Sequence, residues 1–285
     1  MKFDLSLVPF SRYGSYLSFS HLKQTPFGAG VFLRSVRGDV PVREILRVEL
    51  TDHGKVVPYE IEARPECLSL KSRCGRLEIC FEAPQVVRLC GTGGVRLTLC
   101  AIGTFGNAFP AQAGAWQINA WESRLQLMLT SLRGEMKVDA PMDVARCKRV
   151  VVELCPGPGG EPVECALDEF LTSWEPRRYA ASFERCVAAA GREFRQWLKA
   201  APPTAPALAA ARELAAYVNW SSVVAPSGHF KRPAMLMSKN WMVNLWSWDH
   251  CFNALALTGA GLRDRAYTWT SSVFLLLGHD TARPA

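Results

Sequence analysis

A tryptophan-rich stretch near the C-terminal end holds the residues whose chemistry is easiest to interpret. It reads MSKNWMVNLWSWDHCFNALAL over residues 237–257. Three of the nine tryptophans (Trp241, Trp246 and Trp248) fall within eight residues, and the carboxylate of Asp249 follows the third directly. Flat aromatic faces stack on the C–H face of a sugar ring, and a carboxylate accepts strong hydrogen bonds from adjacent hydroxyls. The stretch is therefore a candidate sugar-binding surface.

Asp249 lies where the hydrophobic pattern becomes helical. Phe252, Leu255 and Ala256 share one helical face. Thr258-Gly259 then provides a stop. An aspartate at a helix start is also a common N-cap, which stabilises the helix by about 1 kcal/mol, and clustered tryptophans often belong to a core. A sugar-binding surface and a capped helix beside a core cluster both fit the pattern.

The same stretch resembles the signature of glycoside hydrolase family 63, a group that includes bacterial α-glucosidase-like enzymes and mannosylglycerate hydrolases. The resemblance rests on Ser238-Lys239-Asn240-Trp241, followed by Trp246-Ser247-Trp248-Asp249-His250-Cys251-Phe252-Asn253-Ala254-Leu255-Ala256-Leu257. Members of the group carry Trp-x-Trp-Asp near the start of an (α/α)6 toroid. The resemblance implies that this chain corresponds to the N-terminal part of such a protein.

The resemblance also implies a role for each matched residue. Asp249 would bind hydroxyls of the sugar that is released. Trp246 and Trp248 would wall that subsite, and Trp241 with Asn244 would lie at its rim. Inverting hydrolysis needs a carboxylic acid and a carboxylate base, and in the family both come from later in the toroid, so no catalytic residue is assigned here. We expect an inverting, α-glucosidase-type hydrolase for oligosaccharides, with no turnover by the 285-residue chain itself.

Alternating hydrophobicity dominates the chain up to about residue 170. Apolar and polar residues alternate most clearly over 46–50, 59–62, 77–81 and 95–99, with glycine and proline between the runs. Short alternating strands with frequent turns predict an antiparallel β-sandwich. Trp116 and Trp121, five residues apart in this region, are spaced so that they could line a groove, but we expect them to belong to the sandwich core.

The apolar period becomes helical near residue 175. Within 179–200, apolar residues recur at 183, 187, 190, 194 and 197, and prolines interrupt the pattern over 201–206. A second helix is expected over 207–222, with an apolar stripe at 208, 211, 214 and 218. A further helix is expected over Arg263–Leu277, with apolar residues on two faces.

These patterns predict a multidomain β + α protein. We expect a β-sandwich over 1–174, a connecting helix and linker over 175–204, and the start of an (α/α)6 toroid over 205–285. Because about three helices are expected, the toroid would be incomplete. The apolar faces of 263–277 would then favour self-association.

Charge, hydropathy and cysteine content limit the classes of partner and cofactor that the protein is expected to have. The net charge is +7, yet the basic residues are scattered with no run of five, so no nucleic-acid partner is expected. No apolar run reaches membrane-spanning length and Asp4 interrupts any leader-like stretch, which favours a cytoplasmic protein without a membrane partner. The ten cysteines contain no Cys-x-x-Cys and the five histidines show no metal-binding spacing, so reduced thiols and no metal or cofactor are expected.

Two other function classes fit the same residues. A non-catalytic carbohydrate-binding or interaction protein needs only the sandwich and a few helices. Lyases, epimerases and phosphorylases also use helical toroids, so a toroid alone does not define hydrolysis.

Overall fold

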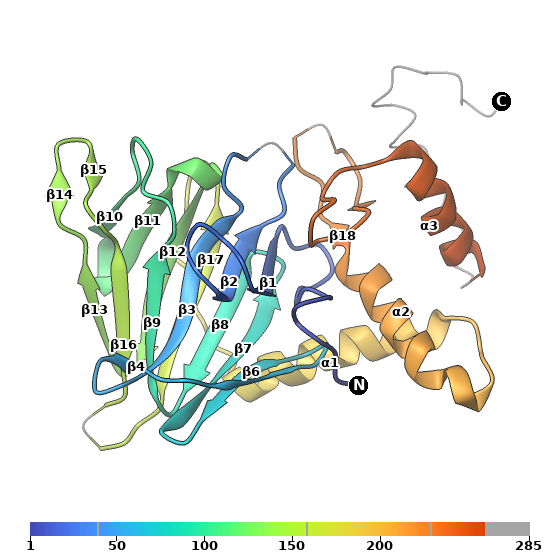
Figure 1. Cartoon of the computed structure of the whole chain (residues 1–285), viewed down its shortest axis with the longest axis horizontal. Coiled ribbons are helices and arrows are strands. Elements are labelled where there is room, and N and C mark those ends of the chain that lie inside the picture. The colour runs from blue at the N-terminus through green and yellow to red at the C-terminus, as the bar shows by residue number, and fades with distance from the viewer. Residues whose placement is uncertain (39, 158, 229, 260–285) are drawn as a thin grey trace.

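A computed structural model describes residues 1–38, 40–157, 159–228 and 230–259, with the backbone alone described at 247, 250 and 257–259. Two antiparallel sheets lie face to face, and helices lie at one end and along one side of them (Figure 1). The helix expected over 263–277 lies outside the described residues. No described helix is both long and apolar enough to cross a membrane.

The first sheet contains seven strands in the order β1-β2-β3-β9-β16-β13, with β4 paired to β3. Their bounds are β1 (Leu17–Leu22), β2 (Gly30–Ser35), β3 (Glu44–Asp52), β4 (Lys55–Val56), β9 (Gly94–Leu99), β13 (Glu135–Asp139) and β16 (Val151–Cys155).

The second sheet contains eight strands in the order β10-β11-β12-β17-β8-β7-β6-β5. Their bounds are β5 (Glu60–Ala63), β6 (Leu68–Ser72), β7 (Gly75–Ala83), β8 (Val86–Gly91), β10 (Asn107–Pro110), β11 (Trp116–Ala120), β12 (Leu125–Arg133) and β17 (Val163–Phe170). A small separate ribbon pairs β14 (Met142–Asp143) with β15 (Arg146–Cys147).

The core between the sheets is built from the alternating residues. In β9, every second side chain is buried, and Leu97 lies opposite Val48 of β3 and Val152 of β16. These residues share one cluster with Leu77 and Ile79 of the other sheet. The predicted antiparallel sandwich is thus confirmed, because the period-two residues of both sheets face one core.

Helix α1 (Phe183–Ala200) covers the outer face of the second sheet. The Ser182 hydroxyl caps it by accepting from the Arg185 backbone N–H at 3.4 Å. Phe183 and Cys186 pack with Cys80 of β7, whose sequence neighbours point into the sandwich core. The predicted apolar face is confirmed at 183, 190 and 194, which are buried.

Helix α2 (Ala209–Ser221) follows a single 3₁₀ turn, η3 (Pro206–Leu208). Its buried residues are Ala216, Tyr217, Trp220 and Ser221. The predicted stripe was wrong, and Leu208 is 56% exposed. The large rings of Tyr217 and Trp220 pack with Phe194 of α1 and so decide which face is buried.

The sequence patterns after residue 175 predict helices and a linker, and the two strands found there were not predicted. Two short strands, β18 (Val223–Val224) and β19 (Ala234–Met235), pair between α2 and α3 (Ser247–Gly259). Gly14 donates its N–H to Val223 O at 2.9 Å, and Ala225 donates to Gly14 O at 2.9 Å. The hairpin therefore gives the N-terminal loop backbone partners that a helix would not offer.

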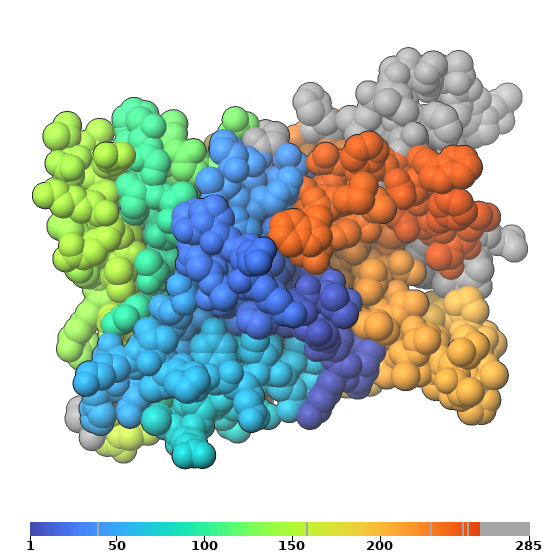
Figure 2. Space-filling view, in the orientation of Figure 1, coloured from blue at the N-terminus to red at the C-terminus, as the bar shows by residue number. Residues whose placement is uncertain are grey.

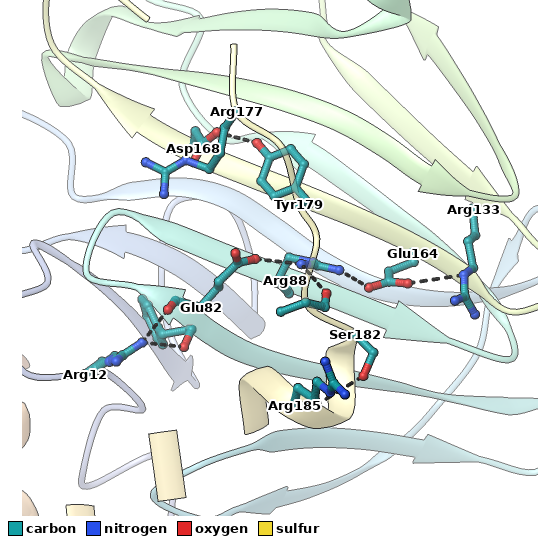
Figure 3. Close-up of polar contacts among 12 residues, drawn as sticks. Arg12, Glu82, Arg88, Arg133, Glu164, Asp168, Arg177, Tyr179, Ser182 and Arg185 are labelled. Carbon is teal, nitrogen blue, oxygen red and sulfur yellow. Dashed lines mark hydrogen bonds and ion pairs between the residues drawn. The ribbon is translucent and has the colours of Figure 1, made fainter. Parts of the chain in front are cut away.

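A buried ionic network holds the 171–182 linker on the second sheet (Figure 3). Arg88 of β8, whose side chain is 2% exposed, pairs with Glu82 at 2.6 Å and with Glu164. It also donates to Ala181 O at 3.4 Å. Further along the sheet, Asp168 accepts from Trp174 at 3.2 Å and from Tyr179. The network therefore joins the linker to β17 and β8 ahead of α1.

Arg88→Met is expected to lower the free energy of unfolding by about 3–5 kcal/mol, because Glu82 and Glu164 lose their buried cation. The control is Arg149→Met, which removes an exposed pair with Asp139 (side chains 58% and 54% exposed) and should cost less than about 1 kcal/mol. Urea denaturation measures both, and equal losses would contradict the role given to Arg88.

Candidate functional site

The first part of the tryptophan-rich stretch, residues 237–244, is a closed loop ahead of α3. Leu236 N–H donates to Ser222 O at 3.1 Å where the loop leaves β19. Met237 N–H donates to Asn244 O at 3.3 Å, and Ser238 N–H donates to Met242 O at 3.0 Å. The loop over 237–244 is therefore fixed by its own backbone before α3 begins.

A buried lysine anchors this loop to the rest of the molecule. The Lys239 ammonium lies within hydrogen-bond distance of Ser15 O (2.6 Å), Ser11 Oγ (3.1 Å), Val223 O (3.1 Å) and Arg12 O (3.3 Å). Lys239 is 3% exposed. Burial lowers its pKa well below the ordinary lysine value, and the negative charge of Glu169 opposes that shift. The N-terminal segment, the β18–β19 hairpin and the loop thus meet at one side chain.

Arg34 of β2 provides a second anchor. It is buried and pairs with Glu44 at 3.1 Å, and it donates to the backbone oxygen of Asn240 at 3.1 Å. Its guanidinium carbon lies 5.4 Å from the centre of the Trp241 ring. A cation at this distance attracts the ring by about 0.5–2 kcal/mol, so Trp241 is oriented from the sandwich side.

Arg37 and Glu169 form a third link, on the neighbouring loop. Arg37 donates to Glu169 at 2.9 Å and lies 4.1 Å from the centre of the Tyr16 ring. The Tyr16 hydroxyl donates to Ala225 O at 2.9 Å. Burial raises the pKa of Glu169, and Arg37 opposes that shift. In Figure 2 the orange segment before α3 lies beside the blue N-terminal part, as these contacts require.

The three tryptophans are exposed to solvent. Trp241 is 66% exposed, Trp246 is 47% exposed and Trp248 is 73% exposed. The alternative that they belong to a core was therefore wrong. Asn244 is also exposed, and a Cβ placed on Gly38 would come within 2.5 Å of its Oδ1.

Asp249 occupies the first turn of α3 rather than the N-cap position, because the helix begins at Ser247. The partial positive charge of a helix N-terminus favours a carboxylate there. Asp249 is partly buried, and none of the described residues forms a hydrogen bond or ion pair with its carboxylate.

Of the five predicted site residues, Trp248 and Asp249 lie in the first turn of α3. The other three lie before the helix. Trp248 packs edge to face on Phe252, with ring centres 5.5 Å apart. Phe252 and Leu255 are themselves 56% and 66% exposed, so α3 presents an apolar face beside Asp249. Trp241 contacts Arg34 instead of α3.

The sequence reasoning missed the anchoring residues. Arg34 stood in an apolar run, Val31-Phe32-Leu33, where a charged residue inside a strand signals a buried ion pair. Lys239 was part of the family resemblance but received no role. Across the described ranges, no group of three or more His, Cys, Asp or Glu side chains is placed to hold a metal ion.

Fold comparison places the chain beside a glycosyl hydrolase. The structure of the family 92 glycosyl hydrolase ccman5 matches with a TM-score of 0.55 and 11% identity, over 89% of this chain and 47% of that chain. The family 92 inverting mannosidase from Bacteroides thetaiotaomicron matches with a TM-score of 0.40 and 9% identity, over 75% of this chain and 34% of that chain. No protein-family model and no curated protein sequence matches the chain.

The first match defines a glycosyl hydrolase-like fold, and the chain spans less than half the length of that hydrolase. At 11% identity the likeness concerns the fold alone. The narrower resemblance to family 63 comes from the tryptophan-rich stretch and belongs to the proposal below.

Lys239→Met is expected to lower the free energy of unfolding by about 2–4 kcal/mol, because Ser15 O and Ser11 Oγ lose a buried donor and each unpaired group costs about 1–3 kcal/mol. The control is Lys231→Met on the same segment, an exposed lysine that donates to Gly228 O. It should change stability by less than about 0.5 kcal/mol. Chemical denaturation tests the pair, and similar values for the two variants would remove the anchor from the account.

Proposed function

We propose that this chain forms the sandwich and the first helices of an (α/α)6 toroid in a glycoside-processing enzyme. Its sugar-binding surface is the segment from Trp241 to Asp249. One observation carries the proposal: three indoles are exposed between Trp241 and Trp248, the last of them directly before Asp249 on α3, and the loop ahead of this helix is fastened to the sandwich by Lys239 and Arg34.

The exposure of these rings supports a ligand-binding role. An indole buries a large apolar area when it enters a core, and contiguous exposed apolar surface marks interaction sites. The loop that carries Trp241 is closed by backbone hydrogen bonds and anchored by Lys239 and Arg34, and Trp248 lies on helix α3. A sugar ring stacked on the exposed part of Trp246 or Trp248 would remove apolar surface from water.

Asp249 supplies the polar half of the interaction. A hydrogen bond to a charged group contributes about 1.5–3 kcal/mol, and adjacent sugar hydroxyls can donate to both carboxylate oxygens. Asn244, exposed on the same loop, adds an amide at the rim. The substrate is thus a glycoside or oligosaccharide bound through its ring face and a pair of hydroxyls.

The inverting mechanism and the α-glucosidase type of activity rest on the sequence resemblance to family 63. In that resemblance Asp249 holds the sugar, and the general acid and base lie further along the toroid. We therefore assign neither role to a residue of this chain, and a binding-only protein is the alternative outcome of the tests below.

Self-association forms a further part of the proposal. The apolar faces of the helix expected over 263–277 predict it, and these residues lie outside the described ranges. The exposed Phe252 and Leu255 of α3 supply an additional apolar face for it.

Asp249→Asn is expected to weaken binding of methyl α-D-glucoside or maltose at least tenfold, because the charge is lost while the side-chain shape is kept. The helix loses only a dipole interaction of about 0.3–1 kcal/mol, so Tm should fall by about 4 °C at most. Calorimetric titration and thermal melting measure the two effects. Asp143→Asn on the exposed strand β14 is the matched control, and unchanged affinity in Asp249→Asn would return this residue to a purely structural role.

The 285-residue chain is expected to bind aryl α-glucosides without cleaving them, because both carboxyl groups of the reaction are assigned outside it. Release of nitrophenol from the aryl glycoside measures turnover. Cleavage above background that a carboxylate substitution within the chain abolishes would show that the catalytic pair was assigned wrongly.

A further inference from the structure

A cavity of about 450 Å³ lies at one end of the sandwich, and no residue of the tryptophan-rich stretch lines it. It forms where a 3₁₀ turn, η2 (Trp121–Ser123), joins β11 to β12. Its volume falls within the roughly 300–1,000 Å³ typical of small-molecule sites. Trp121 and Leu171, two of its lining residues, are 46% and 45% exposed.

Trp121 was expected in the sandwich core, and that prediction was wrong. The strand β11 ends at Ala120, which is buried, and the η2 turn then carries the next side chain outward. The Trp121 ring is supported by Phe105, edge to face with ring centres 4.9 Å apart. An indole fixed from one side and nearly half exposed on the other is a stacking platform for a ligand.

Polar groups of both kinds surround this ring. Asn119 uses its amide N–H to donate to Phe105 O at 3.1 Å, which leaves its carbonyl oxygen as an acceptor. Gln126 accepts from Gln117 and keeps its NH₂ group as a donor. Glu122 and Arg124 also line the cavity. Their formal charges cancel, so the cavity has no excess of one sign to favour a phosphate or another anion.

We propose that this cavity binds a neutral sugar residue, stacked on Trp121 and hydrogen-bonded by the amides of Asn119 and Gln126. A polyhydroxylated ring matches the combination of one aromatic face with balanced donors and acceptors. This site goes beyond the proposed function, because none of its lining residues belongs to the tryptophan-rich stretch.

The loop between β2 and β3 holds the cavity beside that stretch. Pro41 lines the cavity, and the Ser123 hydroxyl donates to Val42 O at 2.8 Å. On the same loop, Gly38 packs against Asn244. Three residues span at most about 11 Å of chain, so Gly38 and Pro41 are close along the loop. A glycan bound in the cavity would therefore lie near the Asn244 end of the proposed surface.

The test titrates maltotriose, α-linked mannotriose and adenosine monophosphate into the full chain carrying Trp248→Ala, in which the first surface is impaired. The same titrations follow in Trp248→Ala combined with Trp121→Ala or with Trp121→Phe. We expect one of the two sugars to bind, at least a tenfold loss of affinity with Trp121→Ala, and a smaller loss with Trp121→Phe. Circular dichroism confirms that each variant is folded.

Three results would overturn the assignment. They are the absence of sugar binding to Trp248→Ala at millimolar concentrations, sugar binding that Trp121→Ala leaves unchanged, and preferential binding of the nucleotide. If Asp249→Asn leaves the sugar affinity unchanged while Trp121→Ala lowers it, only the proposed function fails. If Trp121→Ala leaves the affinity unchanged while Asp249→Asn lowers it, only this second site fails.

Discussion

The buried ammonium group of Lys239 is the constraint on which the arrangement of the helical end depends. A lysine almost never lies fully inside a protein unless its donors are satisfied. Here the oxygens of Ser11, Ser15 and Val223 surround it. The two serines lie more than 200 residues before Lys239 in the sequence. The loop, the N-terminal segment and the β18–β19 hairpin must therefore be in place together, and this fixes where α3 starts.

The sandwich acts as a rigid base for that loop. The side chain of Arg34 projects from β2 and contacts both the backbone of Asn240 and the ring of Trp241. On the opposite sheet, the Arg88 network holds the 171–182 linker. Both the linker after β17 and the loop before α3 are therefore attached to the sandwich. A site built on such supports keeps its geometry better than one on a free loop. The Trp241 ring, which is 66% exposed, is thus held in place by contacts from the sandwich.

Much of the architecture could be predicted from the sequence, because burial in strands has a period of two and the residues of β9 follow it strictly. The tryptophan-rich stretch was found by its side-chain types. Exposure could not be predicted: Trp241 and Trp121 look like core residues, yet the anchors from the sandwich hold the first ring at the surface and the η2 turn carries the second outward. Those anchors join residues such as Arg34 and Asn240, 206 positions apart, and no local pattern encodes such a pair. On α2, the large rings of Tyr217 and Trp220 are buried in place of the predicted apolar stripe.

The central claim is that the indoles of the 241–249 segment receive a sugar. Two-dimensional ¹H–¹⁵N NMR of the nine tryptophan indoles during titration with methyl α-D-glucoside or maltose tests it most directly. The account predicts that the signals of Trp246 and Trp248 shift in a saturable manner, while that of the buried Trp220 stays in place. Saturable shifts confined to other tryptophans, or none at saturating sugar, would contradict it.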